Sequence, residues 1–311
     1  MKNILLTVLR LIALFIVYLV LFTVSSRVNN PPELQSMFTP QQLDQAVIAL
    51  PIVSLIMSLV LAYLALRSRW HGWQLAGALF AILYVLSYFL GWIELLAFPA
   101  VSQNMPAGMV AGLLTSGLIL AIPFSLLAVW ILEKTRKIPV ENQGNNRLHM
   151  PAAEWTWKIT AGAILYTLVY FVFGYYVAWR TPGLPKFYGG TDPGTFPGQL
   201  ANVARETPWL FVLQIFRGLI WTGIGCIIVD MHKGKAWEII LATGLSFTVL
   251  MNASLLFPNP FMPPFVAHAH MIELVSSNFV YGILLSVLLL WTPTQVLRTN
   301  RAAGVKNGIP G

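Results

Sequence analysis

Two ionisable side chains lie inside apolar stretches of this sequence, where they are placed to do chemistry. Arg217 comes eight residues after Trp209 in one stretch, and Glu273 comes seven residues after Val266 in another. At a helical rise of 1.5 Å per residue, both are expected roughly 10 to 12 Å below the same membrane surface. A charged side chain inside a membrane costs about 2.5–3.5 kcal/mol, so it normally faces a partner or a water-filled cavity. We therefore predict that Arg217 pairs with Glu273.

Further polar residues share the helical faces of these two side chains. At 100° per residue, the polar residues that follow Val266 fall within an arc of about 140°, whereas His268 points nearly the opposite way. The residues of this polar face are His270, Glu273, Ser277, Asn278 and Tyr281. The stretch that holds Arg217 has a similar stripe, made of Gln214, Arg217, Trp221 and Gly225.

These faces predict a polar pocket that opens to the outer membrane surface. In this pocket Arg217 attracts negative charge, and Glu273 or His270 exchanges protons or binds a ligand. The predicted ligand-binding residues are Arg217, His270, Glu273, Asn278, Gln214 and Ser277. Asn252 and Glu94, on two further apolar stretches, also lie toward the outer side. The alternative is structural, with the charged pair and the polar residues only holding neighbouring helices together.

The sequence predicts no metal and no cofactor. His270 and Glu273 have the spacing of two ligands on one helical face, and His268 joins them only if the turn before them is not helical. A guanidinium at the same depth opposes a divalent metal. The remaining histidines fall between the apolar stretches, which leaves haem without a second ligand. Phosphate-loop, metalloprotease and serine-hydrolase motifs are missing, and Cys226 is the single cysteine.

Composition indicates the class of protein that positions these residues. Hydrophobic residues make up 57% of the 311-residue chain and charged residues 10%, whereas a soluble domain has about 25% charged residues. Eight apolar stretches each approach the roughly 20 residues that a helix needs to cross a membrane. They lie near Ile4–Val24, Val47–Leu66, Trp73–Phe98, Met109–Leu132, Trp155–Val177, Trp209–Val229, Trp237–Phe257 and Val266–Trp291. The predicted fold is all-α, a polytopic integral membrane protein with eight transmembrane helices.

Basic residues predict the orientation of the chain. They occupy the gaps after the second, fourth and sixth stretches and the C-terminal tail, and none occurs in the gaps after the third and seventh. By the positive-inside rule both termini are cytoplasmic, and we predict the plasma membrane, as a bacterial inner membrane. Lys158, near the cytoplasmic end of its stretch, is expected to reach the headgroups. The dispersed cations argue against a nucleic-acid partner, which leaves the lipid bilayer and a small polar solute as predicted partners.

Two groups of four stretches share a sequence pattern. Trp73, Phe98-Pro99 and Met105-Pro106 recur in order as Trp237, Phe257-Pro258 and Met262-Pro263. We predict two parallel four-helix units, residues 1–137 and 155–296, with a cytoplasmic linker at 138–154 and a cytoplasmic tail at 297–311. The alternative is that tryptophan belts and proline turns recur in unrelated membrane helices. The first stretch is interpreted as an uncleaved anchor, with a cleaved signal peptide as the alternative.

Three functions stay open on these features. The first is binding or translocation of a small polar or anionic solute through the outward-facing pocket. The second is a membrane-embedded enzyme that acts on a lipid-like substrate, with His270 and Glu273 as general acid and base. The third is a non-catalytic subunit of a membrane assembly. Broken helices in both units would favour transport, whereas a one-sided pocket would favour the enzyme.

The longest outer segment runs from Arg180 to Pro208 and is rich in proline and glycine. Such residues favour tight turns, so a regular helix is not expected over most of this segment. Its two predicted roles are a lid over the pocket and a plain connector.

Overall fold

The computed structural model confirms an all-α membrane architecture. It describes residues 2–28, 34, 36–95, 105–106, 108–136 and 147–291. Within these residues, eight helical spans are long and apolar enough to cross a membrane, and each overlaps one predicted stretch. The spans are Ile4–Arg27, Pro40–Leu66, Gly72–Leu95, Met109–Ile131, Ala152–Trp179, Trp209–Met231, Ala236–Leu256 and Pro264–Leu290. The predicted tail, the first part of the linker and the Phe98-Pro99 pair lie outside the described residues.

Five spans are single α-helices, and three change helix type along their length. The single helices are α1 (Lys2–Val28), α3 (Pro40–Leu66), α7 (Met109–Ile131), α11 (Trp209–Met231) and α13 (Pro264–Leu290). The third span consists of α4 (Gly72–Tyr84), the π-helical segment η1 (Val85–Phe89) and α5 (Leu90–Leu95). The fifth is α8 (Ala152–Phe173) followed by the π-helical segment η2 (Gly174–Trp179). The seventh is α12 (Ala236–Asn252) followed by the 3-10 segment η3 (Ala253–Leu256).

Lipid accounts for the exposed apolar surface of these helices. Val47 and Val212 are each 72% exposed within the protein, as side chains that face hydrocarbon would be. In hydrocarbon every backbone group must be satisfied inside its own segment, which a helix achieves. Capping side chains fix where some of the helices begin. Before α3, for example, the Thr39 side chain accepts from the Gln42 N–H at 3.3 Å, and the Gln42 side chain accepts from the Thr39 N–H at 2.9 Å.

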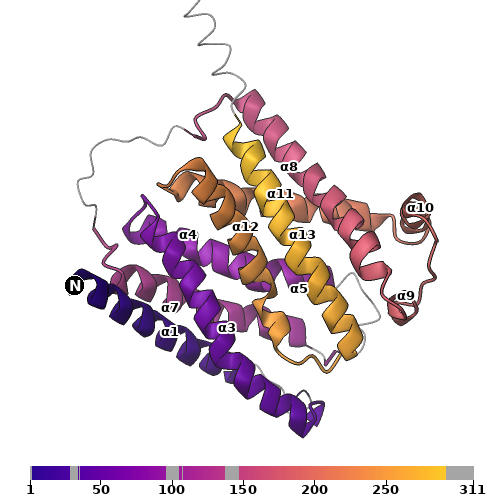
Figure 1. Ribbon diagram of the computed structural model, residues 1–311, viewed down its shortest axis with the longest axis horizontal. Coiled ribbons are helices and arrows are strands. Elements are labelled where there is room, and N and C mark those ends of the chain that lie inside the picture. The colour runs from indigo at the N-terminus through magenta and orange to yellow at the C-terminus, as the bar shows by residue number, and fades with distance from the viewer. Residues whose placement is uncertain are drawn as a thin grey trace, which may run out of the picture.

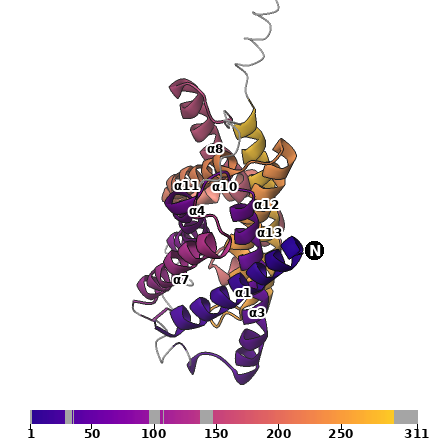
Figure 2. The same cartoon turned by 90° about the vertical axis from the view of Figure 1, so that its left-hand side faces the viewer.

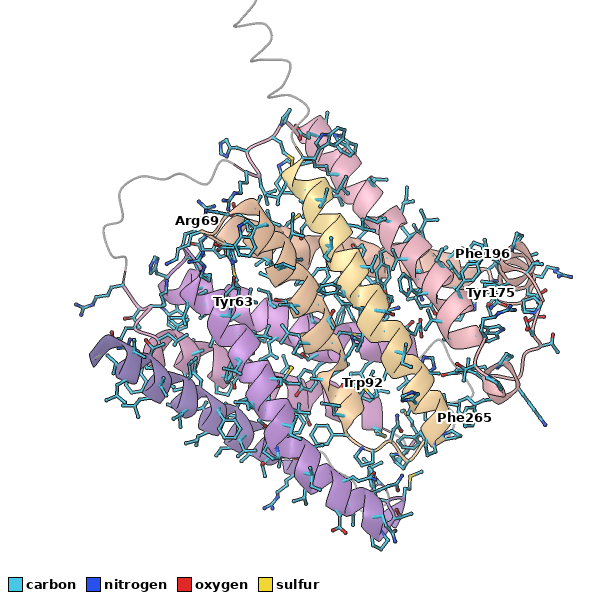
Figure 3. The ribbon with its side chains drawn as sticks, in the orientation of Figure 1. Tyr63, Arg69, Trp92, Tyr175, Phe196 and Phe265 are labelled. Carbon is cyan, nitrogen blue, oxygen red and sulfur yellow. The ribbon has the colours of Figure 1, made fainter. Side chains whose placement is uncertain are left out.

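The segment between the fifth and sixth spans is more helical than its composition predicts. It contains α9 (Leu184–Phe187) and α10 (Phe196–Glu206). The Thr195 side chain caps α10 by accepting a hydrogen bond from the Gly198 N–H at 3.2 Å. The apolar side of α10 packs on the spans, where the rings of Phe196 and Tyr175 have centroids 5.7 Å apart (Figure 3). The sequence predicts no regular helix over most of this segment, and α10 forms because its apolar residues at helical spacing pack against the bundle.

The first four and the last four spans pack in the same order. In the first group, α1 packs against α3 and α7, and α7 packs against α4 (Figures 1 and 2). In the second group, α8 packs against α11 and α13, and α13 packs against α12 (Figure 1). The groups meet where α12 contacts α3 and η1, and where α11 contacts α4. A parallel repeat would produce this order, and the repeat itself stays a prediction.

The gaps after the second, fourth and sixth spans meet at one end of the bundle. We call this end, which carries Arg69, the basic end, and the opposite end, which carries α9 and α10, the distal end (Figures 1 and 3). At the basic end Arg69 pairs with Asp230 at 2.6 Å. Lys134 donates a hydrogen bond to the Ser68 carbonyl, and Arg147 donates one to the His232 carbonyl, each at 2.9 Å. Cations from the second and fourth gaps thus gather at this end, beside His232 of the sixth gap.

Backbone hydrogen bonds join the two groups of spans at the basic end. Ser68 and His232 form an isolated antiparallel bridge. The Arg69 N–H donates to the Met231 carbonyl at 2.8 Å, and the Lys233 N–H donates to the Arg67 carbonyl at 2.9 Å. Ser68 lies five residues before Trp73, and His232 lies five residues before Trp237. The bridge therefore pairs two positions that the predicted repeat makes equivalent.

Lys158 does not reach the headgroups. Its side chain is fully buried, with the ammonium 3.0 Å from Oε1 of Glu154. It donates hydrogen bonds to the carbonyls of Leu289 and Trp291, at the end of α13. The C-terminus of a helix attracts a cation, because its unpaired carbonyls carry partial negative charge. The prediction for Lys158 is wrong because these acceptors come from another helix, which sequence position alone does not reveal.

Two glycines allow close approach of helices in the last four spans. A Cβ atom at Gly218 of α11 would lie 2.7 Å from the carbonyl oxygen of Ala163 on α8. A Cβ atom at Gly282 of α13 would lie 2.7 Å from Cα of Gly244 on α12. Backbone atoms cannot move aside as a flexible side chain would, so both positions require glycine. The residue next to Arg217 thus determines how closely α11 approaches α8.

Replacing Gly218 by alanine is expected to destabilise the protein by about 1–3 kcal/mol, because the added methyl group overpacks the contact with α8. Gly223 on the same helix is the matched control, since a Cβ atom there would meet nothing within 4 Å. Gly223→Ala is expected to stabilise the helix by roughly 0.5–1 kcal/mol. Thermal unfolding of the purified variants in detergent measures both changes. Equal effects of the two substitutions would contradict the close approach of α8 and α11.

Because His232 is buried, we expect the folded protein to lose stability in acid. Burial, and then the charge of Arg67, lowers its pKa from 6.5 to about 4, and its Nδ1 accepts the Gly234 N–H at 2.9 Å. As the pH falls through this interval the unfolded chain binds a proton first, so stability falls. His232→Asn, which keeps an acceptor but does not titrate, is expected to lose less stability between pH 6.5 and 4. Thermal midpoints measured across this interval test the difference, with His149→Asn, an exposed histidine, as the control.

Candidate functional site

Arg217 pairs with Glu94 instead of Glu273. Its Nη2 atom lies 2.6 Å from Oε2 of Glu94, and its side chain is 1% exposed. Glu273 instead has its oxygen Oε2 3.0 Å from Nδ1 of His270. The predicted Arg217–Glu273 pair is therefore wrong. Residue counting gives the depth of a side chain along its helix, but it does not give the direction in which that helix face points.

Two further residues surround the Arg217 guanidinium. Nη1 donates a hydrogen bond to Oε1 of Gln214 at 2.7 Å. The central carbon of the guanidinium lies 5.5 Å from the ring centroid of Tyr166 on α8, which makes a cation–π contact. We call Arg217, Glu94, Gln214 and Tyr166 the Arg217 cluster. The cluster contains two of the predicted ligand-binding residues, Arg217 and Gln214.

Two buried donors in the Arg217 cluster have no hydrogen-bond partner among the described residues. They are Nε of Arg217 and Nε2 of Gln214, both in side chains that are almost fully buried. Arginine only donates, so the Gln214 atom that faces Arg217 is the amide oxygen, and the NH2 group is the unsatisfied one. Leaving a buried donor unsatisfied costs about 1–3 kcal/mol. The cluster is thus short of acceptors.

Glu94 comes from the first four spans, whereas the rest of the Arg217 cluster comes from the last four. It lies on the six-residue helix α5, directly after η1. A π-helical segment widens one turn of a helix, and such segments occur frequently at functional sites. The predicted site lies within residues 155–296, and Glu94 adds a residue of the first group to it. The candidate site lies where the two groups of spans meet.

A second set of hydrogen bonds runs through His270. Nδ1 of His270 lies 3.0 Å from Oε2 of Glu273, and Nε2 lies 2.8 Å from the Tyr188 hydroxyl. An ionised carboxylate only accepts, so His270 donates from Nδ1, and Nε2 accepts from Tyr188. We call Glu273, His270 and Tyr188 the His270 chain. It connects a buried carboxylate to the end of α9 through one imidazole, an arrangement that is able to move a proton.

Aromatic packing holds Tyr188 at the distal end. Its ring stacks on Trp179 of η2 with centroids 6.2 Å apart, and it meets the His270 ring edge-on at 5.8 Å. Burial, together with the negative charges of Glu94 and Glu273, raises the pKa of the Tyr188 hydroxyl above its ordinary value. Tyr188 therefore keeps its proton at neutral pH and donates a hydrogen bond to His270.

The Arg217 cluster and the His270 chain share one wall. The carboxylates of Glu94 and Glu273 both interact electrostatically with Tyr166 and Tyr170 on α8. Glu273 also faces η2, because a Cβ atom at Gly174 would lie 3.9 Å from its Oε1. The fifth span thus borders both sets of residues.

Asn278 and Ser277, the other two predicted ligand-binding residues, bond to neighbouring helices or to their own. Asn278 donates to Oδ1 of Asn252 on α12 at 3.5 Å, and Asn252 donates to the Leu274 carbonyl at 3.1 Å. Ser277 donates to the same carbonyl at 3.4 Å. These bonds help to hold α12 against α13. A ligand-binding role for Asn278 and Ser277 stays a prediction.

An aromatic layer lies one helical turn from Arg217 toward the basic end. Trp221 packs on Phe247 with ring centroids 4.6 Å apart, and Tyr281 stacks on Phe247 at 5.8 Å. These three side chains are fully buried, and Tyr166 packs on both Trp221 and Tyr281. We call Tyr166, Trp221, Phe247 and Tyr281 the aromatic layer. Within the last four spans it separates the candidate site from the basic end.

Metal binding receives no support from the arrangement of ligating residues. Within the part of the chain that the structure describes, no three His, Cys, Asp or Glu side chains are grouped to hold a metal ion. His270 and Glu273 bond to each other and to Tyr188, and Arg217 lies beside the same wall. The prediction that the site lacks a metal stays a prediction.

Comparison with protein-family models, curated proteins and solved structures finds no match to this chain. Function is therefore inferred from the geometry of the site. Tyr166 and Tyr188 are absent from the predicted site, since tyrosines are common in spans and loops and neither has a distinguishing spacing. The sequence alone could have placed Glu94 in the site, because a carboxylate inside an apolar stretch requires a partner.

Removing one member of the Arg217–Glu94 pair is expected to destabilise the protein by about 3–5 kcal/mol, because a buried charge is left unpaired. Glu94→Met is expected to have the larger effect, since Arg217 is 1% exposed and Glu94 is 16% exposed. The double variant Arg217→Met with Glu94→Met is expected to recover most of the loss. Arg180→Met is the control, because its pair with Asp192 is about half exposed and contributes at most about 1 kcal/mol. Unfolding in detergent measures all four, and additive losses would contradict a direct pair.

Proposed function

We propose that this protein binds a small polar solute at its distal end and carries the solute across the membrane together with a proton. The observation that carries this proposal is the buried Arg217–Glu94 pair, which joins the two groups of spans beside the His270 chain. A buried ion pair is often no more stable than apolar side chains of the same size. Ionisable residues inside spans instead mark pathways for solutes and protons.

The position of the pair supports translocation. Transporters with internal repeats place their solute sites between the repeats, on helices that are interrupted. Here Glu94 follows η1 in the first group of spans, and Glu273 faces η2 in the second. The seventh span also changes type, at η3. Interrupted helices therefore occur in both groups, which favours transport over a pocket in one group alone.

The His270 chain supports the coupling to protons. Histidine is the side chain that titrates most readily near neutral pH. When Nε2 of His270 binds a proton, it becomes a donor, and the Tyr188 hydroxyl changes from donor to acceptor. The Glu273 carboxylate balances the positive charge that this creates. We orient the distal end outward and the termini toward the cytoplasm of a plasma membrane, because the basic end has the charge of a cytoplasmic surface.

Translocation requires the rings of the aromatic layer to move apart. Trp221, Phe247 and Tyr281 are fully buried between the candidate site and the basic end. A solute that reaches Arg217 from the distal end can continue only if these rings move apart. We therefore propose that the described state is closed toward the basic end, and that a rearrangement within the last four spans, which hold all the rings of the aromatic layer, opens it.

Proton-coupled transport is measured with the purified full-length protein in vesicles that contain a pH-sensitive dye. The probes are lactate, succinate, ethylammonium and glycerol, which cover anionic, cationic and neutral solutes. We expect a gradient of at least one probe to move protons. His270→Gln is expected to slow this movement by about a hundredfold, the usual size of a lost proton-transfer group.

His268→Gln is the matched control for this measurement, because His268 lies on the same helix but is exposed. It is expected to retain the wild-type rate. Proton movement that is equal in the His270→Gln variant and the wild type would contradict the proposal. So would the absence of proton movement with every probe.

A membrane-embedded enzyme is the second candidate, and the His270 chain favours it. A histidine held by a carboxylate on one nitrogen is the arrangement of a general base. Tyr188 occupies the other nitrogen, so a substrate would have to displace Tyr188 or exchange protons through its hydroxyl. Mass spectrometry of the vesicle lipids distinguishes the two functions. A lipid product that forms with the wild type, and not with His270→Gln, would support the enzyme.

A further inference from the structure

The Arg217 cluster indicates the charge of the solute and the route by which a proton accompanies it, an inference that rests on the proposed function. We propose that the solute carries a carboxylate group, which replaces Glu94 on Arg217 while Glu94 takes up one proton. Three features of the cluster support this exchange: its unsatisfied donors, its charge balance and the position of Glu94.

The unsatisfied groups of the cluster are donors. Nε of Arg217 and Nε2 of Gln214 are buried and have no acceptor among the described residues. A carboxylate is planar and offers two oxygen atoms, which suit the parallel donors of a guanidinium. One oxygen could lie on Arg217 and the other on the Gln214 amide. A cationic solute would leave both donors unsatisfied.

Charge balance explains why a proton must accompany the carboxylate. Arg217 is 1% exposed and already has one carboxylate at 2.6 Å. A second carboxylate would give the cluster a net negative charge, and burying an unpaired charge costs several kcal/mol. In the proposed exchange, the Arg217–Glu94 ion pair breaks, a proton joins one oxygen of Glu94, and an ion pair between Arg217 and the solute forms. The net charge of the cluster stays at zero.

Glu94 is the partner that is free to leave. Its side chain is 16% exposed, whereas that of Arg217 is 1% exposed. It lies on a helix of six residues after a π-helical segment, so a small local change can turn it away from Arg217. Arg217, in contrast, lies in the middle of α11, held against α8 by the close approach at Gly218.

The ionisable groups around Glu94 favour its protonation once the carboxylate of the solute has bound Arg217. They are Arg217 on α11, Tyr166 and Tyr170 on α8, Tyr188 after α9, and Glu273, which acts on the same three tyrosines. Arg217 is the cation of this set, and Glu273 is an anion. Of the helices that pack on η1, α4 carries Tyr84, α7 has no ionisable residue, and α12 has only Glu238, at its basic end; η1 itself carries Tyr88. A solute carboxylate that binds Arg217 therefore neutralises the one cation of this set.

Binding of lactate and succinate to the purified full-length protein tests the exchange. Apparent dissociation constants come from thermal unfolding at intervals between about pH 5 and about pH 8, above the ordinary pKa of a glutamate side chain. Across this interval we expect the wild-type dissociation constant for lactate, which stays a monoanion throughout, to rise about tenfold per pH unit, because binding takes up one proton. Glu94→Gln is expected to keep the low-pH affinity at every pH. The control Glu206→Gln, an exposed residue at the distal end, is expected to follow the wild type.

Proton uptake by the wild type is a second measurement, independent of how well Glu94→Gln folds. In weakly buffered solution, lactate binding is expected to take up about one proton per bound anion. No uptake would overturn the exchange, and so would an unchanged pH dependence in Glu94→Gln. Failure of lactate and succinate to bind the wild type in acid would overturn the carboxylate assignment.

The two proposals fail in different ways. If ethylammonium or glycerol moves protons through a His270-dependent step and neither carboxylate binds, the carboxylate exchange is wrong and proton-coupled transport stands. If lactate binds with the pH dependence that Glu94 sets, but no probe moves protons in vesicles, the exchange stands and transport is wrong.

Discussion

A guanidinium inside a membrane requires a carboxylate beside it, and the distal half of this protein is arranged around that requirement. Arg217 is nearly inaccessible, and its partner Glu94 comes from the other group of spans. The pair therefore makes the two groups depend on each other. Close approach of α11 to α8 at Gly218 then places the Tyr166 ring over the guanidinium. Each of these contacts limits how far any helix around Arg217 can rotate or slide.

Polarity is distributed unequally between the two groups of spans, although both pack in the same order. By the register that pairs Trp73 with Trp237, the position equivalent to Arg217 is Val53, a buried apolar residue. The first group contributes Glu94, and the polar residue beside Val53 is Ser54, whose hydroxyl donates to the Leu50 carbonyl of its own helix at 2.8 Å. Both groups of spans thus share one packing order, whereas the candidate site takes most of its polar residues from the second group.

Sequence reasoning succeeded where one-dimensional information was enough. The apolar length of each stretch predicts all eight spans, and residue counting places Arg217 and Glu273 at the distal side. It failed wherever a partner comes from a distant segment. Glu94 lies more than a hundred residues before its partner Arg217, and the carbonyls that accept hydrogen bonds from Lys158 lie at the end of another helix. The direction in which a helix face points depends on tertiary packing, which a uniformly apolar helix does not encode in its own pattern.

The backbone bridge between Ser68 and His232 gives the molecule a fixed joint. Main-chain hydrogen bonds hold the two halves together at the basic end, whereas the distal contact at Arg217 and Glu94 depends on side-chain charges that a proton can cancel. A span of 24 residues is about 35 Å long at the helical rise per residue. A rotation of about 5° at the joint would separate the distal ends by about 3 Å over that length. Such a displacement is similar to the length of one hydrogen bond, and it would also have to separate the rings of Phe22 and Phe257, which stack between the two groups with centroids 5.3 Å apart.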